Sequence, residues 1–142
     1  MRIQRVASAS WSGGLKDGRG SISTESGVLT QQVYGYAMRF EGVRGTNPEE
    51  LLGAAHVSCF AMALALLLEQ AGFKATRLDA SVVVTLEQGE GAFSIPAIQL
   101  TVKAQVPGID AAQFQSLAAD AKANCPVSKV LRAEISLVAT LN

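Results

Sequence analysis

Hydrophobic and polar residues alternate differently on the two sides of Thr46, where the pattern changes abruptly. Before it, residues 1–40 are rich in β-type residues and in turn glycines, which is typical of short strands joined by reversals. The Gly13-Gly14 and Asp17-Gly18 dipeptides mark two of these reversals. The pattern predicts strands at residues 3–11, 20–24 and 33–40.

A long helix is predicted from Pro48 to about Ala71. Asn47 is a suitable N-cap, Pro48 suits the first helical position, and Glu50 at the third position completes a capping-box arrangement. Gly72 is expected to end the helix. Because the segment is apolar on every face, we expect protein to surround it.

The remainder of the chain combines strand and helix signals. Residues 98–106 alternate between apolar and polar side chains, which is the period of a half-buried strand. After a turn at Pro107-Gly108, Asp110 is expected to cap a helix with one apolar stripe, formed by Phe114, Leu117, Ala118 and Ala121. Further expected elements are strands at 81–86 and 134–141 and a short helix after Cys125-Pro126. The predicted class is α+β, with sheet packed around one buried central helix.

The composition fits a single domain over residues 1–142 that shares its apolar surface with a partner. Hydrophobic residues make up 49% of the chain and charged residues only 17%, so we expect a second subunit to cover part of the surface. The chain has 12 basic and 12 acidic residues, without a run of either sign. This balance favours neither nucleic acid nor an anionic membrane as a partner.

We expect a cytoplasmic protein without a membrane span. The N-terminus has a basic start but lacks the apolar region and cleavage site of a signal peptide. The purely apolar part of the long helix, residues 60–68, is far shorter than the ~20 residues that a span needs. In a reducing cytosol a pair of cysteines is usually catalytic and transient, and this chain has two, Cys59 and Cys125.

Cys59 lies well inside the predicted helix, where the dipole of the helix N-terminus contributes little to ionisation. Only a thiolate is a nucleophile, and burial in apolar surroundings raises the pKa of a thiol, so a nearby cation is required. The candidates are Arg39 at the end of a predicted strand, Arg19 and Arg44 in predicted loops, and His56 one helical turn before the cysteine.

His56 has three interpretations. It shares a helix face with Cys59 and could form a Cys-His nucleophile pair, but no third orienting group accompanies it, and we favour a core or capping histidine. A metal site formed by His56, Cys59 and Cys125 would lack both a Cys-x-x-Cys motif and a second histidine. We therefore expect no metal and no cofactor.

Glu49 is available for a site because Glu50 is already used as the capping-box residue. Along one straight helix, the ten residues between Glu49 and Cys59 correspond to about 15 Å. If both serve one site, either the helix breaks near Gly53 or Glu49 comes from a second subunit. The second alternative agrees with the apolar composition.

Cys125 differs from Cys59 because it is the expected N-cap of a helix whose first residue is Pro126. Its sulfur would face unpaired backbone N–H groups, which lower the pKa of a thiol. A thiol of this kind is suited to be a resolving or leaving group.

Six sequence segments occur in order along nearly the whole chain. They are Ser23-Thr24-Glu25-Ser26-Gly27-Val28-Leu29, Arg39-Phe40-Glu41-Gly42, Gly45-Thr46-Asn47-Pro48-Glu49-Glu50-Leu51, Ala54-Ala55-His56 leading to Cys59-Phe60, Pro107-Gly108-Ile109-Asp110, and Asn124-Cys125-Pro126-Val127-Ser128-Lys129-Val130-Leu131. Together they resemble the OsmC branch of the OsmC/Ohr hydroperoxide reductases, and the joint occurrence of both cysteine motifs is specific.

The resemblance implies an intertwined homodimer, with antiparallel sheets wrapped around two long central helices and two active sites at the interface. It implies a peroxidatic Cys59, a resolving Cys125, and an arginine–glutamate pair formed by Arg39 and Glu49. In the Ohr branch the arginine comes from an N-terminal glycine-rich loop, where this chain has Arg19. We favour Arg39 because the motif around it is the OsmC one.

The expected function is a thiol-dependent peroxidase that reduces organic hydroperoxides, and hydrogen peroxide less well, to alcohols. It would proceed through a Cys59 sulfenic acid and a Cys59–Cys125 disulfide. An external dithiol, lipoyl-type by the resemblance, would reset the pair. Met38, Phe60 and Phe114 are candidates either for a pocket that prefers alkyl peroxides or for plain core. The alternative is a non-catalytic β-rich dimer that binds a small apolar ligand.

Overall fold

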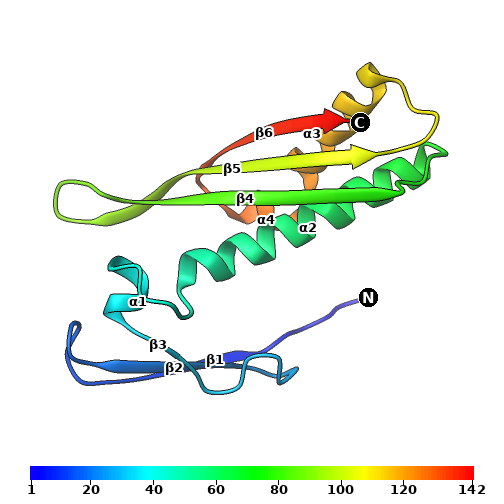
Figure 1. The fold of residues 1–142 in the computed structure, drawn as a ribbon. Coiled ribbons are helices and arrows are strands. Elements are labelled where there is room, and N and C mark those ends of the chain that lie inside the picture. Colours follow the sequence, from blue (N-terminus) through cyan, green and yellow to red (C-terminus); the bar gives the residue numbers. More distant parts are fainter. The chain divides into compact units, whose positions relative to one another are not determined.

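The computed structural model describes residues 1–142, which form two compact units, Met1–Leu51 and Leu52–Asn142. Each unit contains a three-stranded sheet, accompanied by helices (Figure 1). This combination confirms the predicted α+β class. The single domain over residues 1–142 stays a prediction.

The sheet of the first unit is antiparallel, in the order β1-β2-β3. Its strands are β1 at Ala7–Ser12, β2 at Arg19–Thr24 and β3 at Gln32–Tyr34. Gly20 pairs with Trp11 on one side and with Tyr34 on the other, and the two rings lie 5.6 Å apart between centroids. A Cβ atom on Gly20 would come within 2.6 Å of the Trp11 ring and 2.5 Å of the Tyr34 ring. The packed rings therefore require a glycine at this position.

The predicted strand at residues 33–40 is wrong in its second half. Strand β3 ends at Tyr34, and helix α1 follows at Tyr36–Phe40, with the Arg39 N–H donating to the Gly35 carbonyl at 3.2 Å. The rings of Tyr36 and Phe40, one helical turn apart, pack at 4.8 Å between centroids, a contact that a strand would not allow. Arg39 therefore lies in a helix and not at the end of a strand.

The predicted strand at residues 3–11 begins later than expected, at Ala7. Strand β1 pairs only with β2, and the last residue of β2, Thr24, is opposite Ala7. The regular pairing ends there, and beyond it the Val6 carbonyl accepts one hydrogen bond from the Glu25 N–H at 3.0 Å.

Helix α2 spans Pro48–Gln70, close to its predicted bounds. The Asn47 side chain accepts a hydrogen bond from the Glu50 N–H at 2.8 Å, and its amide also contacts the Glu50 carboxylate. This is the predicted capping arrangement, with the glutamate bonded to the side chain of the N-cap. The helix continues through Gly53 without a break, and a Cβ atom there would lie 3.0 Å from Val82.

The C-terminal end of α2 is a Schellman motif centred on Gly72. Gly72 has φ of 90°, its N–H donates to the Glu69 carbonyl, and the Phe73 N–H donates to the Leu68 carbonyl at 2.8 Å. Only glycine adopts this left-handed conformation without strain, which confirms the predicted stop.

The sheet of the second unit has the order β4-β5-β6. Strands β4 (Arg77–Gln88) and β5 (Phe93–Gln105) form an antiparallel hairpin, and β6 (Glu134–Leu141) is parallel to β5. Both long strands extend beyond the predicted segments, because their register continues from Arg77 opposite Gln105 to Gln88 opposite Phe93. The final strand has its predicted bounds.

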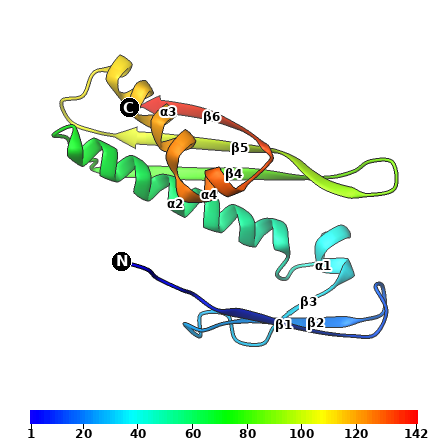
Figure 2. The same ribbon diagram turned by 180° about the vertical axis from the view of Figure 1, so that it is seen from behind.

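Helices α3 (Ala111–Asn124) and α4 (Pro126–Val130) connect β5 to β6. The Gln113 N–H donates to the Asp110 side chain at 2.8 Å, which confirms the predicted cap of α3. Figure 2 shows α2, α3 and α4 on the same face of this sheet.

The core of the second unit lies between that face of the sheet and the helices. Each of α2, α3 and β5 contributes completely buried apolar side chains, including Phe60, Leu64 and Leu68 from α2, Phe114, Ala118 and Ala121 from α3, and Leu100, Val102 and Ala104 from β5. Burying one leucine or phenylalanine side chain contributes about 1.5–3 kcal/mol. Phe60 and Phe114 are therefore core residues.

The opposite face of α2 is exposed in this chain. Met62 is 76% and Leu66 54% exposed, whereas Leu64 between them is buried. In the single chain the sheet and α3 cover only one face of the helix, so its complete enclosure by protein stays a prediction. By length and composition α2 could also cross a membrane, and 28% of its most apolar 18-residue window is buried.

Candidate functional site

Cys59 and Cys125 lie together in the second unit. Their sulfur atoms are 2.7 Å apart and share a hydrogen bond, and both residues are free thiols. Cys125 is completely buried, whereas Cys59 is half-buried. The structure thus brings together two residues that are 66 positions apart in the sequence.

Cys125 is held where two helices meet, because it ends α3 and is the N-cap of α4. Its backbone N–H donates to the Ala121 carbonyl at 3.0 Å, and its carbonyl accepts from the Lys129 N–H at 3.2 Å. Pro126 occupies the first position of α4, as predicted. These restraints fix the direction of the cysteine side chain.

The two thiols have opposite tendencies to ionise. Burial raises the pKa of Cys59, and the hydrogen bond to Cys125 raises it further. Burial also disfavours the Cys125 thiolate, but the contact with Cys59 and the neighbouring polar groups of Ser128 and Val127 outweigh it, so the pKa of Cys125 is lowered. The lowered pKa of Cys125 agrees with the prediction, although its side chain makes no N-cap hydrogen bond. Cys59 needs a cation to become a nucleophile.

His56 is a completely buried residue of α2. Its Nε2 lies 2.7 Å from the Ser128 hydroxyl oxygen, and its Nδ1 has no hydrogen-bond partner. Burial lowers the pKa of His56, so the ring is neutral at physiological pH. The interpretation as a core histidine is supported, and no group of three His, Cys, Asp or Glu side chains is arranged to hold a metal ion.

Arg39 and Glu49 form an ion pair in the first unit. Arg39 Nη2 lies 2.7 Å from Glu49 Oε1, and Arg39 Nε donates to both carboxylate oxygens at 3.2 Å. Glu49 is 9% exposed. A bidentate pair of this kind restrains the guanidinium strongly. By contrast, Arg19 lies at the start of β2 and forms no ion pair.

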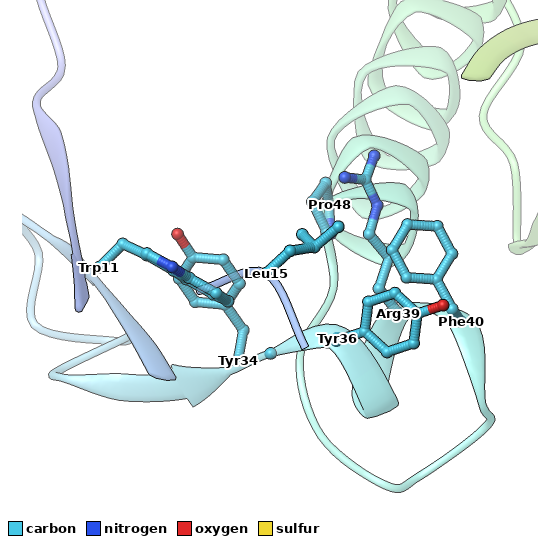
Figure 3. A pocket seen from close by; sticks show the side chains of 8 residues that line it. Trp11, Leu15, Tyr34, Tyr36, Arg39, Phe40 and Pro48 are labelled. Carbon is cyan, nitrogen blue, oxygen red and sulfur yellow. The ribbon is translucent and has the colours of Figure 1, made fainter. Parts of the chain in front are cut away.

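Arg39 also forms part of the wall of a cavity of about 190 Å³ in the first unit. The guanidinium of Arg39 lies 5.4 Å from the centroid of the Phe40 ring. In Figure 3 the Leu15 side chain lies between Trp11 on one side and Arg39 and Phe40 on the other. The lining is mainly aromatic and aliphatic, formed by Trp11, Leu15, Tyr34, Gly35, Tyr36, Arg39, Phe40 and Pro48. Such a cavity suits a small apolar molecule with one polar end. None of Met38, Phe60 and Phe114, the candidates from the sequence, lines it.

The family model described as OsmC-like protein matches residues 41–139. The chain belongs to the OsmC family. It is 53% identical over 137 residues to peroxiredoxin OsmC of Escherichia coli (strain K12), a match that covers 96% of each chain. It is 27% identical over 119 residues to the organic hydroperoxide resistance protein OhrB of Bacillus subtilis (strain 168), covering 83% of this chain and 85% of that protein.

Solved structures share the fold of this OsmC-family chain. The crystal structure of OhrB from Bacillus subtilis matches with a TM-score of 0.68 at 27% identity, over 96% of this chain and 98% of that one. An OsmC-like protein from Mycoplasma pneumoniae matches with a TM-score of 0.76 at 16% identity, over 99% of each chain. At the lower identity the likeness concerns the fold alone. The resemblance to the OsmC and Ohr proteins seen in the sequence is confirmed.

Ser128 is the residue of this OsmC-family site that the sequence reasoning missed. Its hydroxyl contacts His56, which is 72 positions away in the sequence. Its polar groups also contribute to the lowered pKa of Cys125. The sequence did hold a signal, because Ser128 is the third residue of the helix that Cys125 caps, a position whose backbone N–H commonly bonds to the N-cap side chain.

Proposed function

We propose that this OsmC-family protein is a thiol-dependent peroxidase that reduces organic hydroperoxides, and hydrogen peroxide less well, to alcohols. The observation that carries the proposal is the distance of 2.7 Å between the sulfurs of a half-buried Cys59 and a completely buried Cys125. The names of the relatives, a peroxiredoxin and an organic hydroperoxide resistance protein, support the same class of reaction.

In the first step the Cys59 thiolate attacks the outer oxygen of the peroxide. The O–O bond breaks, the alkoxide leaves and takes a proton to become the alcohol, and Cys59 becomes a sulfenic acid. Cys59 is the better candidate for this role because its side chain is partly accessible, whereas Cys125 is not.

In the second step the Cys125 thiolate attacks the sulfur of the Cys59 sulfenic acid. The S–O bond breaks, hydroxide leaves and is protonated to water, and a Cys59–Cys125 disulfide forms. A disulfide needs its sulfurs about 2.05 Å apart, so only a short approach from 2.7 Å is required. An external dithiol, of the lipoyl type by family resemblance, then reduces the disulfide by exchange.

Arg39, held by Glu49, supplies the cation that Cys59 requires. A guanidinium stays protonated in an apolar pocket and stabilises a nearby thiolate. The bidentate contact with Glu49 restrains its orientation and leaves Nη1 outside the ion pair. The aromatic cavity beside Arg39 would hold the organic part of the peroxide.

The protein acts as a cytoplasmic homodimer with shared active sites. Of the two arrangements that could bring Glu49 and Cys59 into one site, a helix break near Gly53 has no support in the continuous helix α2. The other arrangement takes Arg39 and Glu49 from the second subunit. Met62 and Leu66 on the exposed face of α2 provide apolar surface for such an interface.

The cavity beside Arg39 also favours the alternative, a non-catalytic dimer that binds a small apolar ligand. Counting free thiols before and after one equivalent of cumene hydroperoxide separates the two functions. A peroxidase loses both thiols of each chain and produces one equivalent of the alcohol, and Cys59→Ser should prevent both changes. Two unreacted thiols in the wild-type protein would support the binding protein instead.

A further inference from the structure

Two contacts join α2 to α4, and they repeat with the same spacing. Cys59 of α2 meets Cys125 at the start of α4, and His56 of α2 meets Ser128 of α4. Because residues three apart share one face of a helix, the two contacts lie side by side between the helices. The His56–Ser128 contact therefore restrains the segment that carries Cys125.

The unpaired nitrogen of His56 indicates which nitrogen carries the proton. The neutral ring has one N–H donor and one acceptor nitrogen. If Nδ1 carried the proton, a buried N–H would have no acceptor, a rarer and costlier arrangement than an unpaired lone pair. The proton is accordingly placed on Nε2, which donates to the Ser128 oxygen at 2.7 Å.

This arrangement leaves the hydroxyl hydrogen of Ser128 free to point elsewhere. Ser128 is the third residue of α4, one helical turn from the N-cap Cys125, so the two residues share one face of that turn. The polar groups of Ser128, its hydroxyl among them, contribute to the lowered pKa of Cys125. Ser128 is 7% exposed and Cys125 is completely buried, so water competes little for this interaction.

We propose that His56 and Ser128 are positioning residues for Cys125: His56 orients the Ser128 hydroxyl, and the hydroxyl donates to the Cys125 sulfur whenever that sulfur is a thiolate. The proposal rests on the proposed function, because it concerns the steps in which the Cys59–Cys125 disulfide forms and is reduced. Neither residue exchanges electrons.

The reductive step shows where the hydroxyl acts. The thiolate of an external dithiol attacks the Cys59 sulfur, because Cys125 is inaccessible. The Cys59–Cys125 bond breaks, its electron pair leaves on Cys125 as a thiolate, and a mixed disulfide remains on Cys59. The second thiol of the reductant then releases Cys59. A leaving thiol of lower pKa leaves faster, so the Ser128 hydroxyl speeds the first of these exchanges.

The test follows reduction of a preformed disulfide and needs no peroxide. The full-length protein is oxidised with diamide, and its reduction by excess dithiothreitol is timed by the return of free thiols. Ser128→Ala should slow reduction about three- to tenfold, as loss of one hydrogen bond to a leaving thiolate implies. Ser128→Thr, which keeps the hydroxyl, should recover at least half of the wild-type rate.

Ser58→Ala is the matched control. Ser58 is an exposed residue of α2 whose hydroxyl donates to the Ala55 carbonyl, and its removal should leave the rate unchanged. His56→Gln, which keeps a side-chain N–H, should fall between wild type and Ser128→Ala. A wild-type rate in Ser128→Ala, or a Ser128→Thr variant as slow as Ser128→Ala, would overturn the proposal.

A second measurement uses cumene hydroperoxide and dimedone, which traps sulfenic acids. In Ser128→Ala the first oxidation of Cys59 should keep its rate, while the trapped fraction rises because Cys125 resolves the sulfenic acid more slowly. An unchanged trapped fraction counts against the proposal. If wild-type protein does not react with the peroxide but the diamide series behaves as expected, the proposed function fails and the role of His56 and Ser128 stands.

Discussion

The two pairs of candidate residues are built in contrasting ways. Cys59 and Cys125 adjoin a core of completely buried side chains, and their contact depends on how helices pack on a sheet. Arg39 and Glu49 belong to the first unit, whose strand β1 is exposed along its whole length, and their contact is a bidentate ion pair. The thiols are therefore positioned by packing and the cation by a specific polar contact.

The two contacts are therefore disrupted by different kinds of substitution. Packing restrains many atoms at once, so the sulfurs stay close unless the core itself is disrupted. The guanidinium depends on one carboxylate, and removal of that partner is enough to free it. We therefore expect substitutions of the thiols to abolish turnover with peroxide. Substitutions near Arg39 should instead slow peroxide reduction and shift its pH dependence.

The largest effect is expected from the cysteines themselves. Cys59→Ser should abolish peroxide consumption in an assay with a dithiol reductant, because no other thiol is placed to react first. Cys125→Ser should retain one stoichiometric reduction and then stall as a sulfenic acid or a mixed adduct. Near-normal turnover by Cys59→Ser would show that the nucleophile is assigned wrongly.

The next effect tests the cation. Arg39→Ala should slow peroxide reduction about tenfold or more, since a close guanidinium favours the thiolate by that order. Burial already raises the pKa of Cys59, and loss of the cation would raise it further. The rate of Cys59 alkylation rises with pH as the thiolate forms, so the variant's profile should move to higher pH.

Arg19→Ala and Glu49→Gln are the controls for this prediction. Arg19→Ala should change little, because Arg19 forms no ion pair, whereas Glu49→Gln should lie between wild type and Arg39→Ala. If Arg19→Ala proves the more damaging change, the chain uses the arrangement of the Ohr branch.

A matched pair of leucines compares the two faces of α2. Leu64→Ala should lower the free energy of unfolding by about 2–5 kcal/mol, because Leu64 is completely buried. Leu66→Ala, two residues further on and 54% exposed in the single chain, should instead weaken the proposed dimer. Urea unfolding measures the first effect and sedimentation of the micromolar protein the second. A fully active wild-type monomer would contradict shared active sites.

The smallest effect concerns His56 and acid. Burial lowers the pKa of His56 from its usual 6.5, so the unfolded chain binds a proton there before the folded protein does. The contribution of His56 to stability is complete above pH 6.5 and is lost progressively as the pH falls below that value. Urea unfolding at pH 7 and pH 5 should show this loss in the wild type and less of it in His56→Gln. Equal losses in both would exclude His56 as the cause.

Local features of the sequence determined the ends of α2 and the class of the fold. Asn47, Pro48 and Gly72 act through backbone hydrogen bonds and conformations within a few residues, so their effect can be predicted without the rest of the chain. The strict alternation at residues 134–141 predicted β6 for the same reason. The cysteine motifs were specific enough to indicate the family.

Tertiary structure alone decided what depends on distant partners. Residues 36–40 form a helix in which Arg39 reaches Glu49, although their β-type residues predicted a strand. The hydrogen bond from His56 to Ser128 joins residues 72 positions apart, and no periodicity in either segment encodes the other. The exposed face of α2 was also beyond sequence analysis, because an apolar pattern specifies that a surface is to be buried but not what will cover it.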